Sequence, residues 1–469
     1  MDWEKDILRI EVIPMRTSRF GNVRQAPRKG LAFGGMDVVA LLLGLSASFT
    51  VRLVGIIQVS EVAMFLLLPF LLVTQPKKVL QPGMKAVYLL MGFWLLGQIL
   101  TDIYRQTIPY NWMRGDARIL FFALNLATLT VLLSKNVRRQ AVFVAGYGIG
   151  SLLATRFQLS DAAADYPWKF GYAEGTMVLV ILLSCYFHYR KRYWIVGGLI
   201  VTLVVVNLLM NFRSPILLLM VTMALVVPVV PERVGRMRLL PRAGSPKRVM
   251  VLICIALGFG ALSGILVQLV TRAGWISAEA QEKNLAQSQS LVGMLLGGRP
   301  EIFVSSQAVM DSPILGHGSW AQDLKYTEML YDVDVKYDIP TDTLQSSEDS
   351  SDATIPAHSH IMSSWVQAGI LGAVFWVYVL WVVLKGLMRT ALAQPALAPY
   401  YSWLLAGFVW DVFFSPFNTT RRSIDSLVIL FALEVVERFP MASDRNRRFF
   451  KGRWNRTPLR ERLATAARS

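Results

Sequence analysis

The amino-acid sequence predicts an all-α polytopic membrane protein with about twelve transmembrane helices and one large polar loop. Hydrophobic residues make up 54% of the 469 residues and charged residues only 17%, whereas soluble domains carry about 25% charged residues. Apolar runs recur from residue 37 to residue 437, and runs of roughly 18–20 such residues are typical of membrane-spanning helices. Because the backbone must satisfy its own hydrogen bonds in lipid, these runs predict a helical bundle.

The chain divides into five regions. We expect a basic cytoplasmic arm over residues 1–35, transmembrane helices 1–9 within 36–271, a large outer loop over 272–360, transmembrane helices 10–12 within 361–437 and a basic cytoplasmic tail over 438–469. The expected spans lie near residues 37–53, 57–74, 84–100, 117–133, 140–155, 174–188, 193–210, 214–231, 249–271, 361–384, 398–415 and 423–437. The charged N-terminal stretch lacks the short apolar core of a cleaved signal peptide, so the first span is expected to act as the insertion signal.

The distribution of basic residues sets the expected orientation. With the N-terminus in the cytoplasm and the spans alternating, 34 of the 48 Lys and Arg residues fall on the cytoplasmic side. Cytoplasmic segments of membrane proteins carry such an excess, so both termini are expected in the cytoplasm and the long loop outside. The net charge of +17 therefore favours contact with anionic membrane lipids, and no nucleic-acid partner is predicted.

The outer loop is acidic, with 13 Asp and Glu against 5 Lys and Arg between residues 272 and 359. Ser277 is a candidate cap for helical structure that extends to residue 310. A glycine pair before Arg299 interrupts it, and a second short helix is expected from Glu301 to Met310, ended by the Asp-Ser-Pro run at 311–313. Residues 338–356 lack periodicity and predict a flexible lid or surface excursion.

Three of the four histidines lie in this loop or at its end. His358 and His360 immediately precede a span at the outer interface, where a neutral imidazole can accept a proton. His317 follows the run 313–316 and is expected to belong to a turn that borders the loop cavity. The His-x-His spacing also suggests a metal, but no third ligand cluster accompanies it, so we predict neither a metal site nor a cofactor.

Four arginines are expected on the outer face: Arg213, Arg299, Arg421 and Arg422. A guanidinium group binds phosphate oxygens in a bidentate way and keeps its proton. Asp411, one turn from the outer end of a span, is expected to pair with Arg421 or Arg422, or to hold Arg213. Arginines gathered beside the membrane surface favour an anionic lipid head, and a pyrophosphate-linked lipid is the hypothesis that follows.

Several function classes find no support in the sequence. It contains no phosphate-binding Gly-rich loop with Lys-Ser/Thr, no His-Glu-x-x-His and no Gly-x-Ser-x-Gly. A secondary transporter or flippase remains an open alternative of a different class. Transporters tend to have broken spans and charges near the membrane midplane, whereas the charges here are expected at the outer ends.

Three motifs, which follow one another along the chain, resemble those of the O-antigen ligase and polymerase superfamily in content and in order. The segment 357–372, with His358, Gly369 and Gly372, is similar to the pattern that closes the family's large periplasmic loop. The segment 297–303 around Arg299 and the run 311–318 look like its Gly-Arg helix and its Pro-Leu-Leu-Gly-x-Gly turn, and Arg213 with Ser214 resembles its Ser-Arg-Gly element.

Three positions depart from the family pattern. Ser359 stands where Asn commonly follows the His, and Ser214-Pro215 follows Arg213 where Gly is usual. Gln367 stands where Glu or Asp commonly precedes the first Gly of the closing motif. These departures bear on the subfamily rather than on the superfamily.

The resemblance implies a metal-independent glycosyltransferase that uses an undecaprenyl-pyrophosphate-linked glycan at the periplasmic face of the bacterial inner membrane. Arg213 and Arg299 would bind the donor pyrophosphate, and His358 would accept the proton of the acceptor hydroxyl. Arg421, Arg422, His360, His317 and Asp411 are the further candidate substrate-binding residues.

The expected reaction is the polymerisation of lipid-linked repeat units into an exopolysaccharide or O-antigen. The alternatives are an O-antigen ligase that transfers the glycan to the lipid A core, and a transporter of polysaccharide or lipid-linked sugar. The expected partners are the lipid-linked donor, an acceptor glycan or lipid A core, membrane lipids, a chain-length regulator and a flippase.

Overall fold

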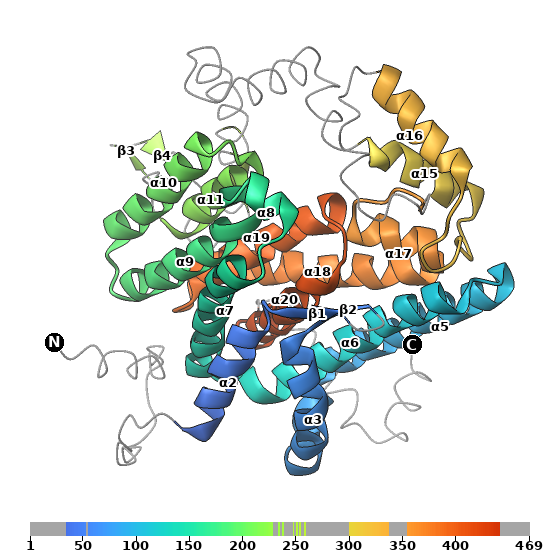
Figure 1. The fold of residues 1–469 in the computed structure, drawn as a ribbon. Coiled ribbons are helices and arrows are strands. Elements are labelled where there is room, and N and C mark those ends of the chain that lie inside the picture. The colour runs from blue at the N-terminus through green and yellow to red at the C-terminus, as the bar shows by residue number, and fades with distance from the viewer. Residues whose placement is uncertain are drawn as a thin grey trace, which may run out of the picture.

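The computed structural model describes residues 34–52, 55–227, 300–336 and 354–440, with residues 233–234, 237–238 and a few positions between 247 and 258. Within these residues the chain is almost entirely helical, and the only sheets are two antiparallel two-stranded hairpins. Helices α18, α19 and α20 occupy the middle of the molecule, with α9, α10 and α11 on one side and α15, α16 and α17 on the other (Figure 1).

Short connections join the elements from α2 to α11 and from α17 to α20. From the N-terminus they are α2 (Gly35–Ser46), β1 (Thr50–Arg52), β2 (Ile56–Gln58), α3 (Val59–Thr74), α4 (Pro76–Val79), α5 (Pro82–Arg105), α6 (Pro109–Leu133), α7 (Val137–Phe157), α8 (Asp161–Asp165), the π-helix η2 (Trp168–Tyr172), α9 (Ala173–Tyr189), α10 (Tyr193–Leu209) and α11 (Arg213–Val226). The later elements are β3 (Arg233–Val234), β4 (Met237–Arg238), α15 (Glu301–Asp311), α16 (Leu324–Lys336), α17 (His360–Ala368), α18 (Ile370–Ala393), α19 (Ala398–Phe414) and α20 (Thr419–Arg438).

Four helical stretches among the described residues are long and apolar enough to cross a membrane. They are Gly83–Arg105, Pro109–Leu133, Trp168–Tyr189 and Ile370–Ala393. Shorter apolar helices lie over Gly35–Ser46, Val59–Thr74, Tyr193–Leu209 and Arg213–Val226. The chain is therefore an all-α membrane protein, as predicted, while the count of twelve spans and the sidedness of the loop stay predictions.

Two predicted spans differ from the structure. The run 37–53 is helical only to Ser46, after which β1 and β2 form a hairpin in the register Thr50–Gln58, Val51–Ile57 and Arg52–Ile56. The run 361–384 is broken at Gly369, whose φ of 64° ends α17 and precedes the start of α18. The predicted span 249–271 and the predicted helical stretch 277–299 lie almost wholly outside the described residues, as does most of 338–356.

Aromatic side chains form the centre of the bundle beneath the break at Gly369. Trp94 of α5 and Phe122 of α6 pack against Phe375 and Trp376 of α18, with ring centroids 5.0–6.1 Å apart across the group, and Phe417 joins them from the α19–α20 connection. Aromatic pairs at these separations stabilise packing beyond the burial of their surface. The group joins α5, α6 and α18 into one body and supports the polar residues above it.

The loop helices have a small core of their own. Val304, Ala308 and Val309 of α15 pack against Tyr326 of α16 and Val366 of α17. Helix α15 ends at Asp311, so the short helix predicted before the Asp-Ser-Pro run is confirmed. This packing fixes the position of α15 relative to α17, and hence relative to the outer end of the bundle.

Candidate functional site

The motif glycines bring the turn 314–318 into direct backbone contact with the break between α17 and α18. The His317 amide donates to the Val366 carbonyl at 2.6 Å, and the Ile370 amide donates to the Ile314 carbonyl at 3.2 Å. A Cβ placed on Gly369 would lie 1.9 Å from the Ile314 carbonyl oxygen. A side chain cannot fit there, so the spacing of the motif follows from the close approach of two backbones.

The end of α5 holds the same turn from the other side. Both carboxylate oxygens of Asp102 accept hydrogen bonds at 2.6 Å from Ser319, one from its amide and one from its hydroxyl. The Arg105 guanidinium donates to the Gly316 carbonyl at 3.0 Å. Asp102 lies just beyond the predicted span 84–100 and was not among the candidate site residues, although an acid at a span end suggests a specific role.

His358 lies at the outer end of the bundle against the first residue of α15. Its Nδ1 is 4.0 Å from Glu301 Oε1, and the two side chains are 44% and 24% exposed. The backbone on either side of His358 is anchored, because Ser363 Oγ donates to the Ala357 carbonyl at 2.7 Å and Ser359 Oγ donates to the Val412 carbonyl at 2.9 Å. Ser359 also caps α17 by accepting from the Met362 amide.

His360 is buried, in contrast to His358. Its Nδ1 is 2.6 Å from the Ser415 carbonyl oxygen and its Nε2 is 3.1 Å from Asp425 Oδ2. The rings of Trp376, Phe408 and Phe417 surround the imidazole. The pair joins the start of α17 to α20, and the assignment of His360 to substrate binding stays a prediction.

The two neighbouring arginines of α20 have different partners. Arg421 pairs with Asp411 of α19 at 2.8 Å, and its side chain remains 34% exposed. Arg422 forms a bidentate pair with Glu61 of α3, with both contacts at 2.6 Å, and its side chain is 5% exposed. The predicted pairing of Asp411 is thus confirmed with Arg421.

Glu61 has a full set of buried partners in addition to Arg422. It accepts from Asn125 Nδ2 and from the Gln58 amide, each at 2.8 Å. At the start of an apolar run the sequence favours a helix-capping role for Glu61, and its bond from the Gln58 amide is part of a capping box at the start of α3. We call His360, Asp425, Arg422, Glu61 and Asn125 the buried polar layer. We call His358, Glu301, Arg421 and Asp411 the rim.

Arg213 and Arg299 are the two arginines predicted to bind the donor pyrophosphate. Arg213 is exposed at the start of α11, which packs against α10 and α19. Helix α19 also packs against α17, the helix that follows His358. Arg299 lies outside the described residues, immediately before Pro300, which caps α15. Their roles at the donor pyrophosphate stay predictions.

His317 belongs to the turn, as expected from the sequence. Its Nε2 is 2.8 Å from the Ala308 carbonyl oxygen at the end of α15, and its ring contacts Tyr326. This imidazole therefore fixes α15 against the turn. Its predicted contact with substrate stays untested.

Arg118 of α6 is a buried arginine that sequence analysis did not single out. Its Nη2 donates to Gln367 Oε1 at 2.6 Å, and its guanidinium faces the Phe417 ring at 5.8 Å. Within the part of the chain that the structure describes, its Nε has no hydrogen-bond partner. The partner of this guanidinium is therefore a neutral amide and not a carboxylate. The feature of the sequence that could have identified Arg118 is its position inside an apolar run.

A charged pair at the far end of α15 ties it to α16. Asp311 accepts from Lys325 Nζ at 2.6 Å, from the Tyr326 hydroxyl at 2.7 Å and from Gln307 at 2.8 Å. These hydrogen bonds, that of Lys325 first, hold the pKa of Asp311 well below its usual range. Burial and the Asp311 carboxylate raise the pKa of Tyr326.

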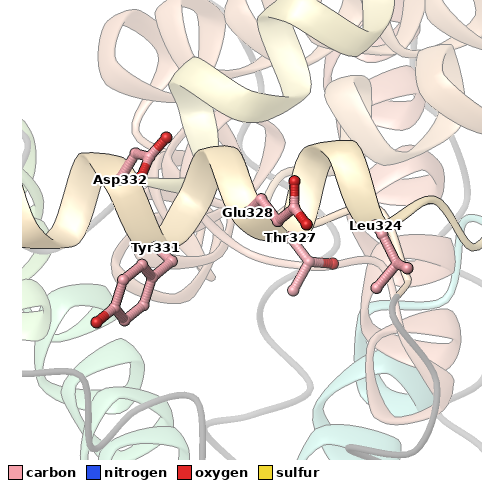
Figure 2. A pocket seen from close by; sticks show the side chains of 5 residues that line it. All are labelled: Leu324, Thr327, Glu328, Tyr331 and Asp332. Atoms are coloured by element: carbon pink, nitrogen blue, oxygen red, sulfur yellow. The ribbon is translucent and has the colours of Figure 1, made fainter.

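A hollow of about 400 Å³ lies along α16 (Figure 2). Leu324, Thr327, Glu328, Tyr331 and Asp332 line it. Two carboxylates and no cation face it, so its charge disfavours a pyrophosphate. The chemistry of the motifs places the candidate site at the rim instead.

Within the described ranges, no group of three or more His, Cys, Asp or Glu side chains could hold a metal ion. No model of a known protein family matches the sequence, and no curated protein matches it either. The functional assignment therefore depends on the chemistry of the rim and on the resemblance of the motifs.

Proposed function

We propose that this chain is a membrane glycosyltransferase that polymerises undecaprenyl-pyrophosphate-linked repeat units into a surface polysaccharide. It acts in the bacterial inner membrane with its site facing the periplasm, without a metal. The long apolar helices support the membrane location. The order and content of the three motifs support the reaction type.

One observation carries the proposal: the closing motif and the Gly-Arg motif meet in space. His358 lies against Glu301, the first residue of the helix that follows Arg299 in sequence. An imidazole beside a lipid-facing end of the bundle can receive a proton from an acceptor hydroxyl. Arg299, two residues before Glu301 in the sequence, would stabilise negative charge on the departing pyrophosphate.

Arg421 is a further cation on the rim that would bind the donor. Arg421 is partly exposed and pairs with Asp411. Its exposed guanidinium N–H groups would donate to the donor phosphate, while Asp411 holds the side chain in position. Arg213, at the start of α11, would contact the phosphate groups as the second donor-binding arginine. The acceptor sugar then approaches between these cations and His358.

The decisive experiment uses purified protein in lipid nanodiscs with a lipid-linked oligosaccharide, with and without lipid A core. A ladder of longer lipid-linked chains is the expected result. Transfer of the glycan to lipid A core would assign the ligase reaction instead, and lipid flipping in vesicles with neither product would assign transport. A chelator should leave the rate unchanged, and metal-dependent transfer would contradict the proposed mechanism.

Substitutions at the three motif residues test the assignment of roles. His358→Ala, Arg299→Ala and Arg213→Ala should each leave the protein in the membrane and abolish polymer formation. Arg156→Ala is the matched control, because Arg156 is an exposed arginine at the end of α7. Full activity of His358→Ala would remove the proposed base.

A further inference from the structure

We infer that Glu301 is a positioning residue that orients the His358 imidazole and stabilises its protonated form. This inference rests on the proposed glycosyl transfer with His358 as the base. Glu301 Oε1 lies 4.0 Å from His358 Nδ1. Glu301 Oε2 is buried and, among the described residues, has no hydrogen-bond partner. Buried carboxylate oxygens are normally hydrogen-bonded, so this arrangement needs an explanation.

The chemistry of a histidine base provides one. An imidazole accepts a proton at one nitrogen, and an acceptor at the other nitrogen fixes the tautomer and the ring orientation. With Nδ1–H directed at Glu301, the lone pair of Nε2 faces the acceptor sugar. A separation of 4.0 Å is too long for a hydrogen bond, and such contacts often tighten only when substrate binds.

Glycosyl transfer at this site involves one proton transfer, one bond formed and one bond broken. The acceptor hydroxyl gives its proton to His358 Nε2, and its oxygen forms the new bond to the anomeric carbon of the donor. The bond from that carbon to the phosphate oxygen breaks, and undecaprenyl pyrophosphate leaves with the electron pair. The imidazolium that results carries a positive charge, which the adjacent carboxylate stabilises.

The scaffold holds the two groups in place. Val304 and Ala308 of α15 are buried against α16 and α17, and His317 contacts the Ala308 carbonyl at 2.8 Å. The segment before His358 is fixed because the Ile355 amide donates to the Ala321 carbonyl at 2.9 Å. The relative position of Glu301 and His358 is therefore set by packed structure rather than by the side chains alone.

Other charged groups on the elements around α17 have partners elsewhere. They are Asp425 with His360, Asp411 with Arg421, Asp311 with Lys325, Asp102 with Ser319, and Arg105 with the Gly316 carbonyl. Among the described residues, Glu301 is an acid that lies against His358. A purely structural alternative is that Glu301 only complements the helix dipole at the start of α15.

The two roles differ in their effect on the pH–rate profile. We would measure polymerisation of a lipid-linked oligosaccharide at saturating donor between pH 5 and 9 for the wild type, Glu301→Gln, Glu301→Asp and Glu328→Gln. Glu328 is an exposed acid on α16 and serves as the control for loss of one charge from the loop.

For Glu301→Gln we expect a kcat lower by about 10- to 100-fold. Loss of the carboxylate destabilises the imidazolium, so the acidic limb of the profile should move to lower pH by about one unit. Glu301→Asp should restore part of the rate, and Glu328→Gln should match the wild type. A lower rate with an unmoved acidic limb, or a wild-type rate, would overturn the inference and leave the proposed function standing. A wild type that transfers no glycan would instead overturn the proposed function itself.

Discussion

His358 and His360 stand two residues apart at the same end of the bundle, yet the first side chain is 44% exposed and the second is fully buried. His360 fills its two ring nitrogens with Ser415 and Asp425, whereas His358 lies 4.0 Å from Glu301. This difference in exposure distinguishes charged groups that hold helices together from charged groups that a ligand can reach. In the buried polar layer, ion pairs such as Arg422–Glu61 and His360–Asp425 join one helix to another. On the rim, the side chains of His358 and Arg421 are partly exposed, so a ligand can reach them.

Removal of one charge from the buried polar layer should have the largest effect. Glu61→Gln leaves the Arg422 guanidinium buried without its carboxylate, since Arg422 is only 5% exposed. Breaking a buried pair by removing one partner costs about 3–5 kcal/mol. We expect a much lower yield of monodisperse protein and a lower Tm in detergent. An unchanged Tm would mean that the layer contributes little to stability.

The same substitution at both histidines tests the comparison directly. His358→Leu should reduce the rate of glycan transfer at least about 100-fold, with a free energy of unfolding within about 0.5 kcal/mol of the wild type. His360→Leu should instead destabilise the protein by about 1–3 kcal/mol, because Asp425 and the Ser415 carbonyl lose a buried partner. Transfer assays and thermal unfolding in detergent would separate the two. The comparison would be wrong if both variants lost stability equally.

A methyl group at the α17–α18 break tests how firmly the rim is held. Gly369→Ala introduces a Cβ 1.9 Å from the Ile314 carbonyl at a φ of 64°. Strain at such a position costs about 1–3 kcal/mol, and displacement of the turn should also reduce transfer. Gly92→Ala on α5 is the control, because nothing lies within 4 Å of its Cβ. Equal stability of the two variants would show that the turn can move away without cost.

Part of this arrangement was predictable from the sequence. The apolar runs predicted the positions of helices such as α5 and α6, and the Asp-Ser-Pro run predicted the end of α15. The ten-residue spacing of Asp411 and Arg421 made their pairing foreseeable, since one short turn returns the chain to the same membrane face.

Other features depend on how helices rotate against one another. In a lipid-embedded bundle both faces of a helix are apolar, so periodicity does not show which polar residue faces inward. The Glu61–Arg422 pair joins residues 361 positions apart and has no local signal. The break at Gly369 lies inside an apolar run and becomes visible only through the backbone of Ile314 packed against it.

The smallest expected effect is a weaker packing of α16 against α15 at low pH. Hydrogen bonds from Lys325, Tyr326 and Gln307 lower the pKa of Asp311 in the folded protein. Because the folded pKa lies below the unfolded value of about 3.9, this contact stabilises the docking of α16 fully above that value. The stabilisation is lost as the pH falls toward the folded pKa. The protection of α16 amides against hydrogen exchange, relative to the intrinsic rate at each pH, should therefore fall below about pH 4 in the wild type. In Asp311→Asn the acid-dependent change should be absent, and a wild-type response of that variant would assign the effect to another group.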